Sequence, residues 1–299
     1  AFRSELRRIP DVANACSVIS ALLQTVLVLG VSAWSTHWAW WPAVWMPAIV
    51  LLGRSFAQLA SLMHESAHRL LFSNRQLNDG VGRWLLGFPM WTSTDAYRRV
   101  HLAHHRQEFG PDEPDLALYR GYPITQASFR RKLWRDLRGT TGLRLLVGQW
   151  RTAIASPDSR VRSTFAKIVL TQAVLAGLMT WLGHPLMYPL LWLFPYLTVW
   201  RVINRLRSIA EHGGLHASTD RRETTHSVRQ RPLARFALVP YCIGWHLAHH
   251  VDSGIPFRHL PRYHQALVES GFIADGLEYP SYRALWRALR GGTAEHLGA

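Results

Sequence analysis

Eight of the sixteen histidines in this chain fall into three tight groups, which are the residues best suited to chemistry. The first group has the spacing His-x-x-x-His, and the second and third both read His-Leu-Ala-His-His. The members are His64 and His68; His101, His104 and His105; and His246, His249 and His250. Chance alone would rarely produce two such strings beside a third pair, so the groups predict metal binding.

Helical spacing explains how each group could act as a unit. Residues three or four positions apart lie on the same face of a helix. His64 and His68 can therefore bind one metal together. In the two longer strings, the first histidine is expected to share a face with the last two.

The number of histidines bears on the identity of the metal, because imidazole alone binds iron, zinc, copper or nickel. Zinc takes four protein ligands in structural sites and three plus water in catalytic ones, so eight histidines exceed its needs. They fit two ions of higher coordination number, each keeping a position for water or dioxygen. The only cysteines, Cys16 and Cys242, lie far apart in sequence and predict neither a disulfide framework nor a cysteine metal site.

Four apolar segments are expected to carry these groups across a membrane. About 20 apolar residues suffice to cross a hydrocarbon core of about 30 Å. The segments are residues 13–33, 42–71, 164–181 and 186–208. A secretory signal is the alternative for the first, but its apolar run exceeds the roughly 7–15 residues of a signal peptide. Two shorter apolar stretches, 81–91 and 233–245, are expected to lie at the interface or re-enter the membrane.

Charge distribution predicts the orientation. The formal net charge of +15 comes almost entirely from arginine, and the two turns between paired spans contain neither lysine nor arginine. By the positive-inside rule, both termini and the regions 72–163 and 209–299 are cytoplasmic. This accounts for the charge without nucleic acid, for which no module is recognisable. The sequence thus predicts an all-α, multi-pass integral membrane protein, one domain over 1–299, whose four transmembrane helices carry a cytoplasmic helical cap with the metal site.

The order and spacing of the three groups resemble the histidine boxes of the membrane fatty acid desaturase and hydroxylase superfamily. Two further strings resemble its acyl-lipid desaturase branch: Pro-Asp-Glu-Pro-Asp at 111–115 and Ile-Pro-Phe-Arg-His-Leu-Pro at 255–261. The resemblance implies a non-haem di-iron centre and a ninth histidine outside the boxes. The resemblance implies that this histidine commonly lies just after the fourth span, which is the position of His212, and Gly213 and Gly214 could end the helix and free its ring. His216 is the alternative.

Polar residues near the boxes are candidates for supporting roles. Five carboxylates are expected to orient imidazoles through the ring nitrogen that does not face the metal, although each could equally be a solvated surface charge. They are Glu65, Asp112, Asp115, Glu211 and Asp252. The amide of Asn204 is a candidate to bind a metal-bound water. Arg54 lies within the second span, where it is expected to pair with a substrate headgroup or carboxylate. The alternative is that it snorkels to the interface or bonds to a neighbouring helix.

The resemblance also implies an activity. The expected reaction is the O₂-dependent introduction of a double bond into a long acyl chain of a lipid, with two iron ions as cofactor. The electrons are expected from a separate donor, a ferredoxin or a cytochrome with its reductase, and the location is expected to be a bacterial inner membrane. Alternatives are a lipid or alkyl hydroxylase or a carotenoid-type ketolase of the same superfamily. A membrane metal transporter or sensor is a more distant one, since it would place titratable groups throughout the spans.

Overall fold

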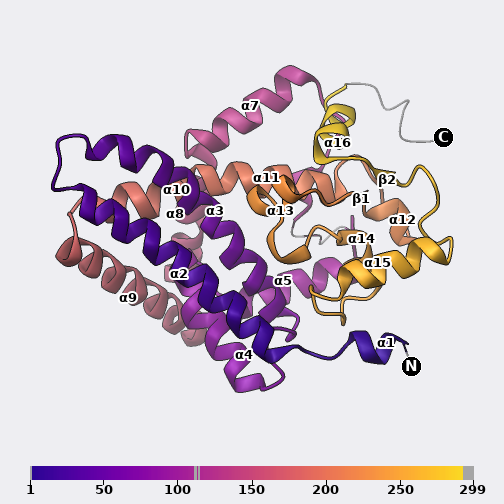
Figure 1. Cartoon of the computed structure of the whole chain (residues 1–299), viewed down its shortest axis with the longest axis horizontal. Helices are drawn as coiled ribbons and strands as arrows, with labels where there is room; N and C mark the ends of the chain where they lie inside the picture. The colour runs from indigo at the N-terminus through magenta and orange to yellow at the C-terminus, as the bar shows by residue number, and fades with distance from the viewer. Residues whose placement is uncertain (1, 111–112, 114, 292–299) are drawn as a thin grey trace.

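A computed structural model of the chain describes residues 2–110, 113 and 115–291. This part is mostly helical (Figure 1), as predicted. The exception is a small parallel pair of strands, β1 (Ser227–Val228) and β2 (Glu278–Tyr279).

Three long apolar helices lie together at one end of the molecule (Figure 1). They are α2 (Asp11–Ser35), which follows the short α1 (Phe2–Leu6), α3 (Trp41–Ala67) and α9 (Ser159–Leu182). Each is long and apolar enough to cross a membrane. For α2, the candidate segment also includes α1 and runs from Phe2 to Ser35. The first three predicted spans are thus confirmed as candidate membrane helices, with ends that differ by a few residues.

The predicted fourth span, 186–208, is not one continuous helix. It is divided into the π-helical η3 (Tyr188–Leu193), α10 (Phe194–Leu197) and α11 (Val199–His212). Prolines lie in the first turn of the first two pieces, and Thr198, with φ −119° and ψ −84°, separates α10 from α11. Proline removes a backbone donor and clashes with the preceding turn, so a straight helix is disfavoured here. A count of four spanning helices therefore remains a prediction.

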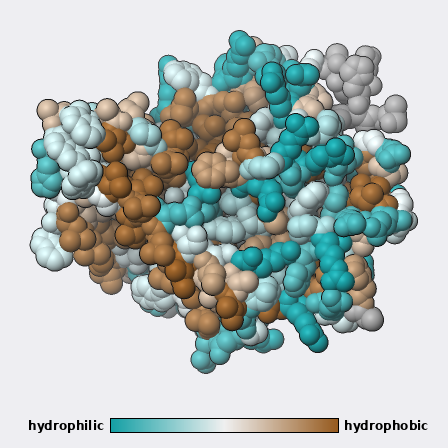
Figure 2. Space-filling model, in the orientation of Figure 1, coloured by the Kyte–Doolittle hydropathy of each residue, from teal (hydrophilic) through white to brown (hydrophobic). Residues whose placement is uncertain are grey.

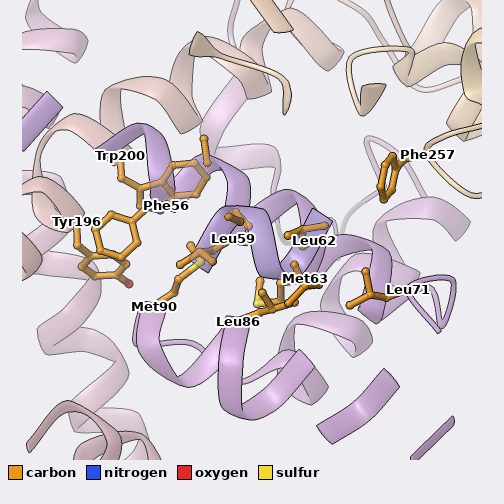
Figure 3. Close-up of a cluster of buried hydrophobic side chains, with 14 of the residues drawn as sticks. Phe56, Leu59, Leu62, Met63, Leu71, Leu86, Met90, Tyr196, Trp200 and Phe257 are labelled. Carbon is orange, nitrogen blue, oxygen red and sulfur yellow. The ribbon is translucent and has the colours of Figure 1, made fainter. Parts of the chain in front are cut away.

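Helix α3 lies at the centre of the apolar core. Its side chains are buried almost without interruption from Leu52 to Ala67. Phe56 packs on Tyr196 with ring centroids 5.5 Å apart, and Trp200 lies beside this pair (Figure 3). A Cβ on Gly53 would collide with the side chain of Val199, so the glycine permits α3 and α11 to lie close together.

Shorter helices connect and cover the long ones. After α3 come α4 (Arg75–Val81), η1 (Gly82–Gly87), η2 (Phe88–Met90), α5 (Thr94–Arg106), α6 (Leu116–Tyr119), α7 (Gln126–Leu137) and α8 (Thr140–Ala155). After α11 come α12 (Arg221–Thr224), α13 (Pro232–Ala237), η4 (Pro240–Cys242), α14 (His246–Val251), α15 (Leu260–Glu269) and α16 (Tyr282–Leu289). The two short apolar stretches expected near the boxes fall on η1–η2 and on α13–η4.

The surface is divided in the same way as the helices. Apolar residues gather over α2 and α3 in Figure 2, whereas hydrophilic residues dominate the half that contains α12, α15 and α16. Large apolar side chains such as Val26, Leu27, Leu170 and Trp181 are exposed on α2 and α9. Such a contiguous apolar surface is typical of contact with lipid.

Candidate metal centre

Nine histidines form two adjacent groups beside the C-terminal ends of α3 and α11. Within each group, the ring nitrogens that could bind a metal lie within 4.8 Å of one another. The first group contains His64, His68, His101, His105 and His249; the second contains His104, His212, His246 and His250. The structure therefore brings together all eight boxed histidines and His212. His216 is 73% exposed beside Glu223 and belongs to neither group.

Helix ends position most of these rings. His68 directly follows the last residue of α3, and its backbone N–H donates to the His64 carbonyl at 3.1 Å. Helix α14 begins at His246. Helix α11 ends at His212, and Gly214 follows with φ +82°, which glycine adopts without strain. The expected helix end at this histidine is thus present.

Each His-x-x-His-His string divides its histidines between the two groups. In α5, the Nε2 atoms of His101 and His105 lie 3.1 Å apart in the first group, while His104 joins the second. In α14, the Nε2 atoms of His246 and His250 lie 3.0 Å apart in the second group.

The third member of α14, His249, joins the first group instead, where its Nε2 lies 3.0 Å from that of His105. The expectation that the first histidine shares a face with both of the last two is therefore wrong. Only residues i and i+4 converge, because residue i+3 projects far enough around the helix to reach the other group.

Hydrogen bonds orient the rings of the second group. The Nδ1 of His104 donates to Glu113 Oε2 at 2.9 Å, and that of His212 donates to the Thr224 carbonyl at 2.8 Å. The Nδ1 of His250 faces Glu108 in the same manner. An acceptor at Nδ1 fixes the proton there and leaves the lone pair of Nε2 free for a metal.

The first group contains buried nitrogens without partners. Both ring nitrogens of His64 and the Nε2 of His68 have no hydrogen-bond partner within the described residues. Burial lowers the pKa of His105 and His249 well below its ordinary value, which favours the neutral imidazole that binds metals. A buried polar atom without a partner is costly, and metal binding by one ring nitrogen of His64 and by His68 Nε2 would satisfy two of these three atoms. The donor set therefore fits two metal ions.

Two of the predicted carboxylates contact other partners than imidazole. Glu65 accepts a hydrogen bond from the backbone N–H of Phe257 at 2.9 Å, because it points away from its helical neighbour His64. Asp252 accepts two bonds of 3.0 Å from Arg7. Among the described residues, neither carboxylate contacts an imidazole, so the prediction that Glu65 and Asp252 orient histidines is wrong.

Two of the other predicted carboxylates lie beside histidines of the candidate metal centre, and the third lies outside the described residues. Glu211 accepts a bond from Arg207 at 2.6 Å and lies 3.7 Å from His246 Nδ1. Asp115 lies beside His104 and Glu113. Asp112 lies outside the described residues.

The sequence interpretation missed Glu108, Glu113 and the Thr224 carbonyl, which accept the Nδ1 hydrogens described above. Glu108 and Glu113 follow His105 by three and eight residues, and this closeness to the second histidine group could have identified them as candidate partners of its imidazoles. Thr224 contributes a backbone oxygen, for which a side-chain pattern offers no signal.

Arg54 is held by its neighbours. Its Nη1 donates to Gln58 at 2.7 Å and to Gln24 at 2.9 Å, and its Nε donates to the Phe236 carbonyl at 2.8 Å. The alternative of bonding to neighbouring elements thus describes this arginine, and no part of it lines the cavity at the metal centre.

A cavity of about 180 Å³ opens directly onto the metal centre. Four of the histidines line it: His101, His104, His212 and His246. Its apolar wall includes Ala60, Met63, Met90, Tyr196 and Trp200. The last four belong to the buried hydrophobic cluster of Figure 3. Its polar lining includes Asp115, Arg201, Asn204, Arg207, Ser208 and Glu211. A small molecule in this cavity would lie against histidines of both groups.

Comparison with known proteins agrees with the histidine pattern. The sequence model of the family described as fatty acid desaturase matches residues 39–286. Dihydrorhizobitoxine desaturase of Bradyrhizobium elkanii is 26% identical over 234 residues, which is 73% of this chain. Delta(5) fatty acid desaturase fat-4 of Caenorhabditis elegans is 38% identical over 65 residues, or 20% of the chain. The chain spans 66% of the length of the first relative and 14% of the second.

Proposed function

The chain belongs to the fatty acid desaturase family, and from this premise we propose that it is an O₂-dependent membrane oxidoreductase that introduces a double bond into an alkyl chain. The observation that carries the proposal is the convergence of nine histidines into two adjacent groups beside one cavity. Acid–base groups alone cannot remove hydrogen from an unactivated methylene, so a redox metal is required.

The nine histidines are the proposed ligands of two iron ions. Five would hold one ion and four the other, with the division described above. An all-imidazole donor set suits iron, and the acceptors at Nδ1 would hold the rings of the second group in the binding tautomer. When bound, iron supplies the reduction of dioxygen to an oxidant that removes hydrogen from carbon. Glu108 and Glu113 join the site as positioning residues.

The protein's own part in the reaction is to bind and place the substrate. The apolar wall formed by Met63, Met90 and Trp200 would hold methylene groups, and the adjoining rings of His101 and His246 mark the reacting position. Burial of these side chains keeps bulk water from the reacting carbon. The proposed acyl substrate would enter from the bilayer, since each buried methylene contributes about 0.8 kcal/mol to partitioning. One similar protein is named for dihydrorhizobitoxine rather than for a fatty acid, so the proposed substrate need not be a fatty acyl lipid.

Topology and electron supply complete the proposal. Both termini and the metal centre would face the cytoplasm of a bacterial inner membrane, with a fourth membrane crossing formed by η3, α10 and α11. A separate ferredoxin or cytochrome, together with its reductase, would supply two electrons per turnover. The arginine-rich hydrophilic half would attract an acidic donor of this kind.

Expression of the protein in iron-replete cells with an electron donor tests the function. We expect about two irons per chain and a dehydrogenated lipid or small metabolite detected by mass spectrometry, both lost or reduced in His101→Ala. Full iron content and full activity in that variant would contradict the ligand assignment. A product that gains oxygen rather than losing two hydrogens would instead identify a hydroxylase or ketolase.

A further inference from the structure

Arg201 is an unpaired cation in the wall of the metal-centre cavity. Its Nε is buried and has no hydrogen-bond partner among the described residues, and its guanidinium lies 4.4 Å from the centre of the Tyr196 ring. The next arginines of α11 differ, because Arg205 pairs with Asp136 and Arg207 with Glu211. Within residues 2–110, 113 and 115–291, no carboxylate forms an ion pair with Arg201.

Arg201 begins a polar stripe that leads along α11 to the metal centre. Asn204 and Ser208 follow at spacings of three and four residues, line the same cavity, and precede His212. Helical rise places the Cα atoms of Arg201 and His212 about 16 Å apart. Arg201 and His212 therefore line the same cavity from positions about three helical turns apart on α11.

This arrangement suits an anion better than an alkyl tail. A methyl terminus beside Arg201 would leave a buried guanidinium N–H without a partner, which is costly. A carboxylate or phosphate would accept two parallel hydrogen bonds from the guanidinium in a geometry that lysine cannot reproduce. The volume of about 180 Å³ is also small, since a cavity of roughly 150 Å³ is filled by benzene.

We propose that the part of the substrate held in this cavity is short and ends in an anionic group that pairs with Arg201. This inference rests on the proposed function, because it assumes that the cavity receives the substrate of the metal centre. The distance from Arg201 to the histidines would then select which carbon reacts. The substrate class is an alkyl carboxylate or alkyl phosphate rather than a chain whose methyl end fills the cavity.

Binding of simple probes tests the inference without turnover. The full chain, purified in lipid nanodiscs from iron-replete cells, is titrated with pentanoate, pentyl phosphate and pentan-1-ol, and binding is measured by saturation-transfer NMR. We expect one of the two anions to bind at least about 10-fold more tightly than the alcohol, since hydrogen bonds to charged groups contribute this much. Which anion binds distinguishes a carboxylate from a phosphate source.

Three variants locate the effect. Arg201→Gln should lose the preference for the anion and keep the affinity for pentan-1-ol, while Arg201→Lys should keep part of the preference. Arg144→Gln removes the same charge from the exposed surface of α8 and should change nothing.

Two results would overturn the inference. One is equal binding of the three probes by the unaltered protein, and the other is an unchanged preference in Arg201→Gln. The first needs no variant, so misfolding of Arg201→Gln would not leave the inference untested. Because neither result depends on iron content or product, each is distinct from failure of the proposed reaction.

Discussion

Replacing Glu113 by glutamine should weaken metal binding in the second histidine group. The Glu113 carboxylate accepts the Nδ1 hydrogen of His104 at 2.9 Å, and the two side chains are 0% and 4% exposed. Glutamine has nearly the same shape, and its amide oxygen can still accept the backbone N–H of Asp115, now 3.0 Å from the carboxylate. The substitution therefore removes the charge while leaving the local loop in place.

The magnitude follows from the type of hydrogen bond. A bond to a charged group contributes about 1.5–3 kcal/mol, which corresponds to roughly 10- to 150-fold in an equilibrium constant. Changes at residues that orient metal-bound histidines typically cost about 10- to 100-fold in metal affinity. We therefore expect Glu113→Gln to release one iron per chain at a chelator concentration at least about 10-fold lower than the unaltered protein requires.

The assay is a chelator titration of the purified protein followed by elemental analysis of retained iron. Glu223→Gln is the matched control, because this carboxylate is 52% exposed beside His216 and belongs to neither histidine group. Identical release curves for Glu113→Gln and the unaltered protein would refute the role given to this residue. Equal loss of iron in Glu223→Gln would show that the effect is not specific to the site.

Three further predictions concern the metal ligands, a helix contact and an ion pair. His64→Ala and His212→Ala should each lower the iron content from about two toward one per chain, whereas His216→Ala should retain both, as elemental analysis would show; loss of iron in His216→Ala alone would reverse the choice of ninth ligand. Gly53→Leu should lower the thermal stability by about 1–3 kcal/mol, since its side chain would collide with Val199. Gly30→Leu, where a Cβ meets nothing within 4 Å, should melt as the unaltered protein does. Asp136→Ala should destabilise the fold by about 3–5 kcal/mol, because it leaves the buried Arg205 without its partner. The double variant with Arg205→Leu should recover much of that loss in the same melting experiment, and a further loss would argue against a buried charge as the cause.

Hydropathy alone predicted α2, α3 and α9 because each contains a long, predominantly apolar run. It could not predict the interruption of residues 186–208, since that depends on how Pro189, Pro195 and Thr198 act within an otherwise apolar segment. Spacing likewise identified the eight boxed histidines, and the family resemblance, through its place after the fourth predicted span, indicated His212 as the ninth. Their division into two groups depends on how α3, α5 and α14 face one another, which is information that local spacing does not contain.

The same limit applies to the arginines. The rule that a cation within an apolar segment has a function pointed to Arg54, yet two glutamine side chains and a backbone carbonyl already satisfy that residue. Arg201 also lies within a predicted span but is distinguished only by lacking partners. Whether a charge is satisfied is a property of the folded molecule and is absent from the sequence pattern.

Because each His-x-x-His-His string is divided between the two groups, α5 and α14 each contribute histidines to both groups. Turning either helix to bring its histidines closer to one ion would swing its other histidine away from the second ion. The separation of two bound ions would therefore be set by the pitch of these helices, because a helix is far stiffer than a loop. Loading of one position should in turn restrict the rotation of both helices and prepare the other position, so that partly filled protein would be scarce when iron is limiting.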